Sequence, residues 1–278
     1  MSILAHARTG DGPRPLVLLH GFLGSARNLS TLARALVERD PSLAVVALDL
    51  TGHGASPSLP PGADSATLAA DVLATARALG LAQPLALAGH SLGGRVALRA
   101  ALLEPDAVSV LTLLDIAPGP VRDGSVGAIA DIVKTAPDVV PTRGQARAYL
   151  VAAGVPAPIA EWLTLNLEPA DGGYRWRVDR EALAALHARI APEDLWPAVE
   201  GRHAYRVRSV RAAASGYVSD ADVRRLEAAG CPVVTIADTD HFLHAERPRE
   251  TAEAILGGMS LAAVAAGEVA HERRAPSQ

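Results

Sequence analysis

Cysteine and long apolar runs are both scarce in this chain. Cys231 is its only cysteine, so an internal disulfide is impossible and the cysteine content does not favour a secreted protein. No apolar run approaches the roughly 20 residues that a helix needs to span a bilayer. The first residues also lack the basic region and long apolar stretch of a signal peptide. We therefore expect a soluble, cytoplasmic protein without a membrane span.

Lysine is as rare as cysteine, because every positive side chain except Lys134 is an arginine. The formal net charge is −4, which gives no electrostatic reason to expect nucleic acid or an anionic membrane as a partner. Apolar residues make up 49% of the 278 residues and charged residues 20%, so the chain can bury a substantial core. This length fits one large α/β domain, or one domain that carries a sizeable insertion.

The most informative segment is an apolar run, residues 85–88, that leads directly into Gly-His-Ser-Leu-Gly at residues 89–93 and then into an apolar helix pattern. A serine on such a strand-to-helix turn is held in a strained conformation that lifts its hydroxyl above the sheet edge. Gly89 and Gly93 suit this turn because a Cβ at either position would collide with it. The start of the helix also points free N–H groups at Ser91, where negative charge develops during acyl transfer. We therefore predict Ser91 as a nucleophile.

Strand patterns alternate with helix patterns over the first half of the chain, which is typical of a mostly parallel, doubly wound α/β sheet. The predicted strands cover residues 16–19, 44–48, 85–88, 108–114, 205–210 and 233–236, and the predicted helices cover residues 29–38, 65–79, 91–104, 220–229 and 248–256. Each strand is followed by a polar or glycine-containing turn. Because ligands of open α/β sheets bind at these carboxyl ends, we expect the site there.

The alternation stops between residues 118 and 202, where helix patterns punctuated by proline replace buried strands. These patterns cover residues 126–135, 143–153, 159–167 and 180–190. We therefore expect a core of residues 1–117 and 203–278 and a mostly helical cap of residues 118–202 over the strand ends. The tail after the last helix pattern is expected to be frayed.

A serine hydroxyl needs a base to take its proton and a third group to orient that base. His241 is the leading base because it follows the last predicted strand, and His244, a few residues later, is a weaker candidate. No cysteine or acidic residues with metal-ligand spacing accompany the two histidines, so we predict no metal. The orienting acid is either Asp115, which ends the strand next after the serine unit, or Asp220. We favour Asp115, because Asp220 is expected to cap a helix.

An oxyanion hole needs two N–H donors aimed at the developing alkoxide. We expect one from the backbone of Leu92, directly after the serine. The second should come from the turn after strand 16–19, at Phe22. The chain has only three Trp, four Tyr and two Phe. From their positions we predict a small apolar substrate pocket lined by Phe22, His90, Trp162, Trp176 and Phe242.

These motifs together resemble the α/β-hydrolase superfamily of serine hydrolases. The resemblance rests on His-Gly at residues 20–21, Asp49 with Gly-His-Gly-Ala-Ser at 52–56, the segment 89–94, and residues 241–248. More narrowly, Leu-Asp-Ile-Ala-Pro at 114–118 is similar to small bacterial carboxylesterases and acyl-CoA thioesterases. In that group the acid follows this earlier strand, and a serine takes the usual acid position. The resemblance implies that Ser215 hydrogen-bonds near His241.

We therefore expect a carboxylesterase-type serine hydrolase that cleaves esters, or thioesters, of small to medium acyl chains through an acyl-enzyme. The expected partner is a small-molecule substrate, and no cofactor is needed. The same residues are compatible with hydrolysis of a carbon–carbon bond or with acyl transfer to an acceptor other than water. A third alternative is a ligand-sensing α/β-hydrolase with slow turnover. The sequence does not indicate the oligomeric state.

Overall fold

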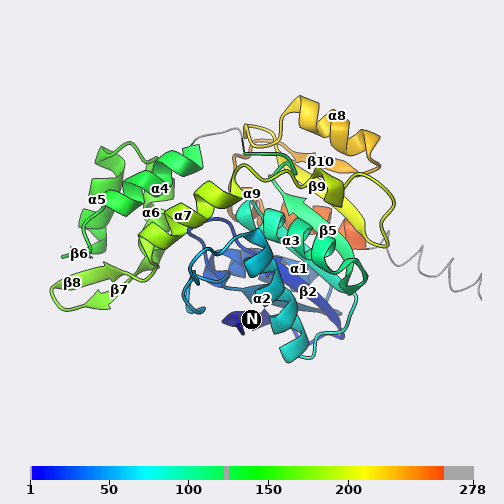
Figure 1. Ribbon diagram of the computed structural model, residues 1–278, viewed down its shortest axis with the longest axis horizontal. Coiled ribbons are helices and arrows are strands. Elements are labelled where there is room, and N and C mark those ends of the chain that lie inside the picture. The colour runs from blue at the N-terminus through cyan, green and yellow to red at the C-terminus, as the bar shows by residue number, and fades with distance from the viewer. Residues whose placement is uncertain (1, 122–124, 260–278) are drawn as a thin grey trace, which may run out of the picture.

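The computed structural model describes residues 2–121 and 125–259 and contains a central sheet of seven strands (Figure 1). The strand order is β1-β3-β2-β4-β5-β9-β10. Their bounds are β1 (His6–Thr9), β2 (Arg14–Leu19), β3 (Leu43–Leu48), β4 (Leu85–His90), β5 (Val108–Leu114), β9 (Arg206–Ala212) and β10 (Val233–Ile236). Strand β1 pairs antiparallel with β3, and the other neighbours pair in parallel. The predicted mostly parallel α/β sheet is confirmed.

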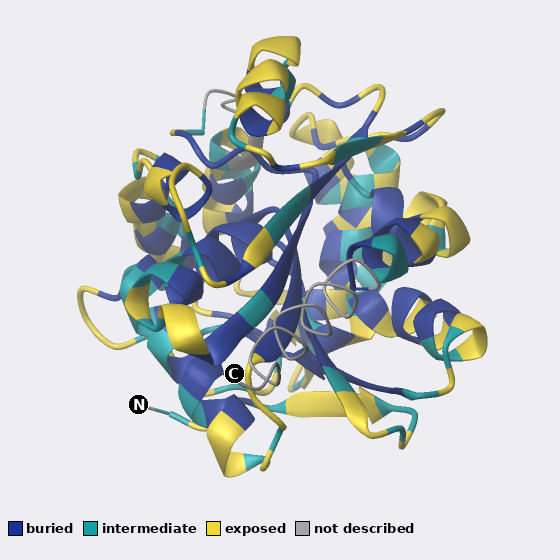
Figure 2. Cartoon of the chain, turned by 90° about the vertical axis from the view of Figure 1, so that its right-hand side faces the viewer, coloured by how far each residue is buried: buried dark blue, intermediate teal, exposed yellow. Residues whose placement is uncertain are grey.

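Helices cover both faces of this sheet, because its central strands carry apolar side chains on both faces. One face is covered by α2 (Ser65–Ala78), α3 (Leu92–Leu103) and α8 (Asp220–Ala228). The other is covered by α1 (Ser30–Arg39), the short α9 (Leu243–Glu246) and a helix of residues 248–259. Figure 2 shows the buried strands enclosed between these layers. The sheet therefore presents its polar turns only at its two ends.

The described residues of the segment 118–202 lie outside this sheet. This segment is called the insertion below, and in Figure 1 its helices and small strands lie to the left of the core. Its helices are α4 (Ser125–Thr135), α5 (Arg143–Ala152), α6 (Ala157–Leu163) and α7 (Arg180–Ile190), with 3₁₀ turns η3 (Thr164–Asn166) and η4 (Trp196–Ala198). The core holds two further 3₁₀ turns, η1 (Ala26–Leu29) and η2 (Pro105–Ala107).

The insertion also contains a sheet that we did not predict. Strands β6 (Val139–Val140), β7 (Leu167–Ala170) and β8 (Gly173–Trp176) form three antiparallel strands in the order β6-β8-β7. They are too short for an alternating pattern to stand out, and the predicted helix 159–167 ends instead at Leu163. Gly172 in the β7–β8 turn and Gly173 at the start of β8 both have a positive φ, and a Cβ on Gly173 would lie 2.2 Å from the carbonyl oxygen of Val140.

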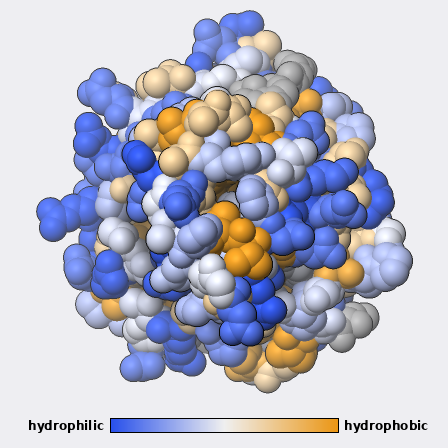
Figure 3. Space-filling model, turned by 90° about the vertical axis from the view of Figure 1, so that its left-hand side faces the viewer, coloured by the Kyte–Doolittle hydropathy of each residue, from blue (hydrophilic) through white to orange (hydrophobic). Residues whose placement is uncertain are grey.

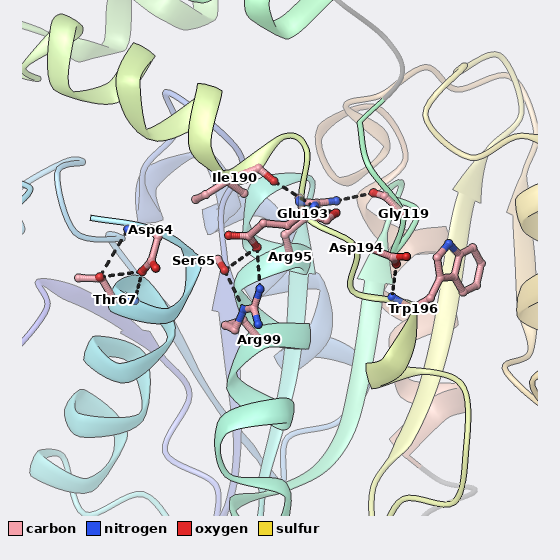
Figure 4. A network of polar contacts seen from close by, with 10 residues as sticks. All are labelled: Asp64, Ser65, Thr67, Arg95, Arg99, Gly119, Ile190, Glu193, Asp194 and Trp196. Carbon is pink, nitrogen blue, oxygen red and sulfur yellow. Dashed lines mark hydrogen bonds and ion pairs between the residues drawn. The ribbon is translucent and has the colours of Figure 1, made fainter. Parts of the chain in front are cut away.

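Two segments, residues 118–121 and 190–195, join the insertion to the core, and we call them the neck. Two backbone hydrogen bonds of 2.8 Å connect them. Arg95 of α3, only 2% exposed, bonds to both segments (Figure 4). Its guanidinium donates to the carbonyls of Gly119 (2.7 Å), Ile190 (3.1 Å) and Glu193 (2.6 Å). The neck is thus attached directly to the helix that follows Ser91.

A second arginine supports this attachment from the solvent side. Arg99 lies one helical turn after Arg95 and forms an ion pair of 3.0 Å with the Glu193 carboxylate. Its Nε also donates to the hydroxyl of Ser65 at the start of α2, and that hydroxyl donates to Glu193 (Figure 4). Burial lowers the pKa of Arg95 to about 10, so its guanidinium remains charged at neutral pH.

None of the helices within residues 2–121 and 125–259 combines the length and the apolar character needed to cross a membrane. The cytoplasmic location stays a prediction. The last helix runs to residue 259, beyond the predicted residue 256, and the expected frayed tail otherwise lies outside the described residues.

Candidate active site

Ser91 lies on a strained turn between β4 and α3. Its φ is +50° and its ψ is −115°, a conformation that L-residues rarely adopt. A Cβ on Gly89 would lie 2.3 Å from the carbonyl group of Gly93, and a Cβ on Gly93 would lie 2.4 Å from the carbonyl oxygen of Leu19. Glycine at both positions therefore lets the turn close tightly against the neighbouring strand, as the sequence predicts.

Asp115 follows β5, the strand next to β4, and its side chain is completely buried. Three donors converge on its carboxylate. The backbone N–H of Ala212 donates to Oδ1 at 3.0 Å, and Nδ1 of His241 donates to Oδ2 at 2.8 Å. The Ser215 hydroxyl also donates to Oδ2, the oxygen that binds His241, so Ser215 hydrogen-bonds near His241 as the family resemblance implies. A buried carboxylate with this set of donors is well placed to hold an imidazole in one orientation.

His241 follows β10 and has its ring fixed from several sides. Because Nδ1 binds Asp115, Nε2 is the nitrogen left to exchange a proton. Tyr217 stacks on the ring with a centroid distance of 3.9 Å and an interplanar angle of 20°. Nε2 of His90 donates to the His241 backbone carbonyl at 2.8 Å. Ser91 and His241 line the same cavity, so the structure places both at one end of the sheet.

The turn after β2, residues 21–24, adjoins Ser91 and is called the oxyanion turn below. A Cβ on Gly21 would lie 3.4 Å from the Cβ of Ser91. The turn is closed by a 3.0 Å hydrogen bond from the Gly24 N–H to the Gly21 carbonyl, and Leu23 has a φ of +56°. Within the described part of the chain, the N–H groups of Phe22 and Leu92 have no hydrogen-bond acceptor. Both remain available to a ligand at Ser91.

Four further histidines around this site are buried and uncharged. Desolvation by burial is the main cause that lowers their pKa values, to about 4 for His20, to about 3 for His53 and His244, and well below the usual range for His90. As a neutral ring, His20 donates from Nδ1 to the Gly21 carbonyl and accepts from a backbone N–H at Nε2. These rings support the turns around Ser91 without adding charge to the site.

Two small cavities meet at Ser91 and share Phe22. The neck-side lobe, of about 20 Å³, is lined by Leu92, Arg95, Ile116, Leu186, His187 and Tyr217 among others. The histidine-side lobe, of about 40 Å³, is lined by Leu23, His90, Trp162, Leu163, His241 and Phe242 among others. Such volumes hold only a few water molecules. Most of the lining side chains are apolar, and several come from the insertion.

The structure brings most of the predicted pocket residues to these lobes, but not Trp176. That side chain lies on β8 beside a separate cleft of about 620 Å³ within the insertion, and its Nε1 donates to the Pro137 carbonyl. Another cleft, of about 540 Å³, lies around the start of β9, away from Ser91. Neither larger cleft is lined by a serine and a histidine together, so the strand ends at Ser91 remain the candidate site.

Asp220, the alternative acid, does not reach His241. Its carboxylate is 77% exposed and forms an ion pair of 2.6 Å with Arg211. The helix cap that we expected from Asp220 is supplied instead by Ser219, whose hydroxyl accepts from the Asp222 N–H. His244, the weaker candidate for the base, packs against the His90 ring at a centroid distance of 4.3 Å and lines neither lobe.

Four residues at or beside the site were not predicted. Of these four, Tyr217 alone had a signal in the sequence, because it lies two residues after Ser215, which was expected near His241. Arg95, His187 and Asn166 gave none, because their partners are distant in sequence. Asn166 of η3, for example, donates to the carbonyl of Leu23, 143 residues away.

Comparisons with known proteins identify the family and the fold of this chain. Residues 16–254 match the family model described as the alpha/beta hydrolase family. The sn-1-specific diacylglycerol lipase ABHD11 of Mus musculus is 30% identical over 88% of this chain and 81% of its own length. Lipase LipV of Mycobacterium tuberculosis is 32% identical over 88% of this chain and 93% of its own length. A marine microorganism esterase shares the fold, with a TM-score of 0.82, 23% identity, and coverage of 93% of this chain and 100% of its own. The chain is therefore a member of the alpha/beta hydrolase family and has the α/β-hydrolase fold.

Proposed function

We propose that this protein is a serine hydrolase that cleaves carboxylic esters through an acyl-enzyme. One observation carries the proposal: a buried carboxylate orients His241 in a cavity that the strained Ser91 also lines. A nucleophile, an orienting acid and a base in this order along the chain are typical of ester hydrolysis on this fold. The lipases among the relatives support the same chemistry.

The first half of the reaction forms the acyl-enzyme. Nε2 of His241 takes the proton of the Ser91 hydroxyl as the oxygen attacks the ester carbonyl carbon. The Asp115 carboxylate stabilises the imidazolium that results and keeps Nδ1 protonated. The carbonyl π electrons move to the oxygen, and the N–H groups of Phe22 and Leu92 bind that oxyanion.

The acyl-enzyme is complete when the intermediate collapses, the bond to the alcohol oxygen breaks and that oxygen takes the proton from His241. In the second half, water gives a proton to His241 as it attacks the acyl carbon. Collapse of this second intermediate breaks the bond to the Ser91 oxygen, which takes the proton back from His241, and the carboxylic acid is released. Because the alcohol oxygen has to approach His241, we assign the alcohol part to the histidine-side lobe. The acyl chain then occupies the neck-side lobe, between Ile116 and Leu186. The same steps apply to a thioester, with a thiol as the leaving group.

We also propose that the insertion acts as a cap. The two lobes are too small to hold an ester, and Trp162, Leu163 and Leu186 of the insertion close them. The insertion has to shift before substrate can enter. Figure 3 shows that the face on this side of the molecule is largely hydrophilic, with small, separate apolar patches. Such a face favours dissolved esters over a lipid surface as the source of substrate.

A burst experiment tests the proposal. Para-nitrophenyl esters of increasing acyl length are expected to release one nitrophenolate per enzyme molecule rapidly and then to turn over steadily. Ser91→Ala should abolish both phases. An acyl thioester with the same acyl group shows whether thioesters are also cleaved. Wild-type protein without burst or turnover, or Ser91→Ala with unchanged turnover, would contradict the proposal, whereas a single burst without turnover would point to a ligand sensor.

A further inference from the structure

Asn166 forms a contact between the insertion and the oxyanion turn. It belongs to η3, and its side chain is buried, with the residue 6% exposed. Its Nδ2 donates to the carbonyl of Leu23 at 2.7 Å and to that of Leu163 at 3.3 Å. Arg143 bonds to the carbonyls on either side of Asn166, those of Thr164 and Leu167. The amide is therefore presented to the core from a fixed part of the insertion.

Its partner, Leu23, is the strained residue of the oxyanion turn. Leu23 is the third residue of this β-turn and has a φ of +56°. Glycine normally occupies a turn position with such a φ, because a side chain makes that conformation unfavourable. Two hydrogen bonds from the core hold the Gly21 side of the turn, from Gly24 and from His20. The Leu23 carbonyl, on the other side of the turn, accepts a hydrogen bond from the Asn166 side chain. Phe22, which lies between these fixed points, carries the proposed oxyanion donor.

The position of this bond matters because of how the insertion is attached. The other described hydrogen bonds that join the insertion to the core lie near its two ends. Arg95, Arg99 and Arg189 bind at or beside the neck, and Tyr205 and Arg225 of the core bind Ala198 and Glu200, shortly after it. Within the described residues of 125–188, the hydrogen bond that reaches the core is that of Asn166. If the insertion opens about its neck, this distant bond is the one that has to break.

The bond also lies at the wall of the substrate cavity. Leu23 and Leu163, whose carbonyls both accept from Asn166, line the histidine-side lobe together with Phe22. A substrate that fills this lobe therefore contacts both sides of the bond, one side on the core and the other on the insertion.

We propose that Asn166 is a positioning residue that couples closure of the insertion to the geometry of the oxyanion turn. When the insertion is closed, the amide holds the Leu23 carbonyl and keeps the Phe22 N–H aimed at the reacting oxygen. When the insertion opens, that constraint is lost and the turn is free to relax. The oxyanion hole is thus complete only with the insertion in place. The inference rests on the proposed ester hydrolysis.

The test compares Asn166→Leu, which matches the shape but cannot donate, with Thr164→Val. Thr164 belongs to the same 3₁₀ turn, η3, and is also buried. Its hydroxyl donates to the carbonyl of Glu161, within the insertion, at 2.6 Å. Rates are expressed per active site from the burst amplitude, so that loss of folded protein does not count as loss of catalysis. We expect Asn166→Leu to lower kcat about 10-fold, less than the 10²–10³-fold loss of a whole oxyanion donor. KM should change less than about threefold, and Thr164→Val should leave both constants unchanged.

Two further measurements separate positioning from a merely structural role. An alkyl trifluoromethyl ketone forms a tetrahedral oxyanion adduct with the serine, so its inhibition constant should rise with Asn166→Leu by the same factor as kcat/KM falls. Adding Leu23→Gly, which tolerates the positive φ, should restore part of the loss. If Asn166→Leu folds too poorly, Asn166→Ala serves instead, because alanine is smaller and also lacks a side-chain donor.

The outcomes are distinguishable. Active wild-type protein with an unchanged kcat and ketone affinity in the Asn166 variants would overturn the coupling and leave the proposed function intact. If Thr164→Val lowers kcat as much as Asn166→Leu does, the effect comes from the stability of η3, and the proposed coupling is also overturned. Wild-type protein that shows no burst would refute the hydrolase itself.

Discussion

Replacing Asp115 by asparagine perturbs the site with almost no change in shape. Three donors converge on the carboxylate, from Ala212, Ser215 and His241. An amide offers one acceptor oxygen and one NH₂ group, so either orientation sets the NH₂ against at least one of these donors. No solvent is available to relieve that conflict, because the side chain is completely buried.

The expected loss of activity follows from the histidine tautomer. An NH₂ group facing His241 favours the ring with its proton on Nε2, where it cannot accept the proton of Ser91. In a serine protease the same reversal lowers kcat about 10⁴-fold, which corresponds to about 5 kcal/mol in the activation barrier. The matched control is Asp220→Asn, which breaks an exposed ion pair with Arg211. Exposed pairs contribute about 0–1 kcal/mol to stability, so kcat should stay within about twofold of wild type.

Steady-state rates with a para-nitrophenyl ester, divided by the amount of folded protein, give the comparison. Near-ultraviolet circular dichroism of both variants should match the wild type. If Asp220→Asn loses more activity than Asp115→Asn, the orienting acid has been assigned to the wrong strand. If Asp115→Asn keeps about a tenth of the wild-type rate, the tautomer argument fails.

Three other perturbations address the rest of the molecule. Arg95→Met removes three hydrogen bonds to the neck, so we expect urea titration to show a free energy of unfolding about 2–4 kcal/mol lower than that of the wild type. Arg99 is partly exposed, so Arg99→Met should lower it by about 1 kcal/mol or less. Trp162→Ala enlarges the histidine-side lobe and should raise kcat/KM for esters of bulky alcohols relative to methyl esters; an unchanged ratio would count against that assignment. Burial lowers the pKa values of His53 and His244 from 6.5 to about 3. Below pH 6.5 these two histidines therefore bind more protons in the unfolded chain than in the folded protein. Their contribution is fully present above that pH and falls by about 1 kcal/mol each between about pH 7 and about pH 5.5; equal urea midpoints at the two pH values would refute it.

The parts of the site that could be predicted depend on short-range constraints. The turn at Ser91 is recognisable because Gly89 and Gly93 have no room for a side chain, and that restriction is written in five consecutive residues. The β5 strand could be placed from its apolar run, and with it Asp115 at the neighbouring strand end. His241 followed from the order of the strands. In each case, the carboxyl ends of parallel strands meet at one edge whatever the loops do.

What could not be predicted depends on contacts between distant segments. The three-stranded sheet of the insertion has strands of two to four residues, too short for a periodic pattern. Trp176 was therefore assigned to the pocket, although its strand turns it to another cleft. Arg95 reads as one polar residue within an apolar helix, and nothing local shows that its partners belong to the neck. The interaction of Asn166 with Leu23 is visible only when the insertion is folded against the core.

The contact between Ser215 and Asp115 has a consequence for how this site could change over time. The Ser215 hydroxyl binds Oδ2 of Asp115, the same oxygen that binds His241. Ser215 follows β9 and Asp115 follows β5, and these two strands are neighbours in the sheet. A carboxylate placed at residue 215 would therefore lie within reach of the same imidazole nitrogen. The negative charge is tied to a point in space that two backbone positions share, rather than to one position in the chain. Exchanging the two side chains would move the acid from the end of one strand to the end of the next, while His241 stays where it is. Two substitutions would thus convert one arrangement of the acid on this fold into the other.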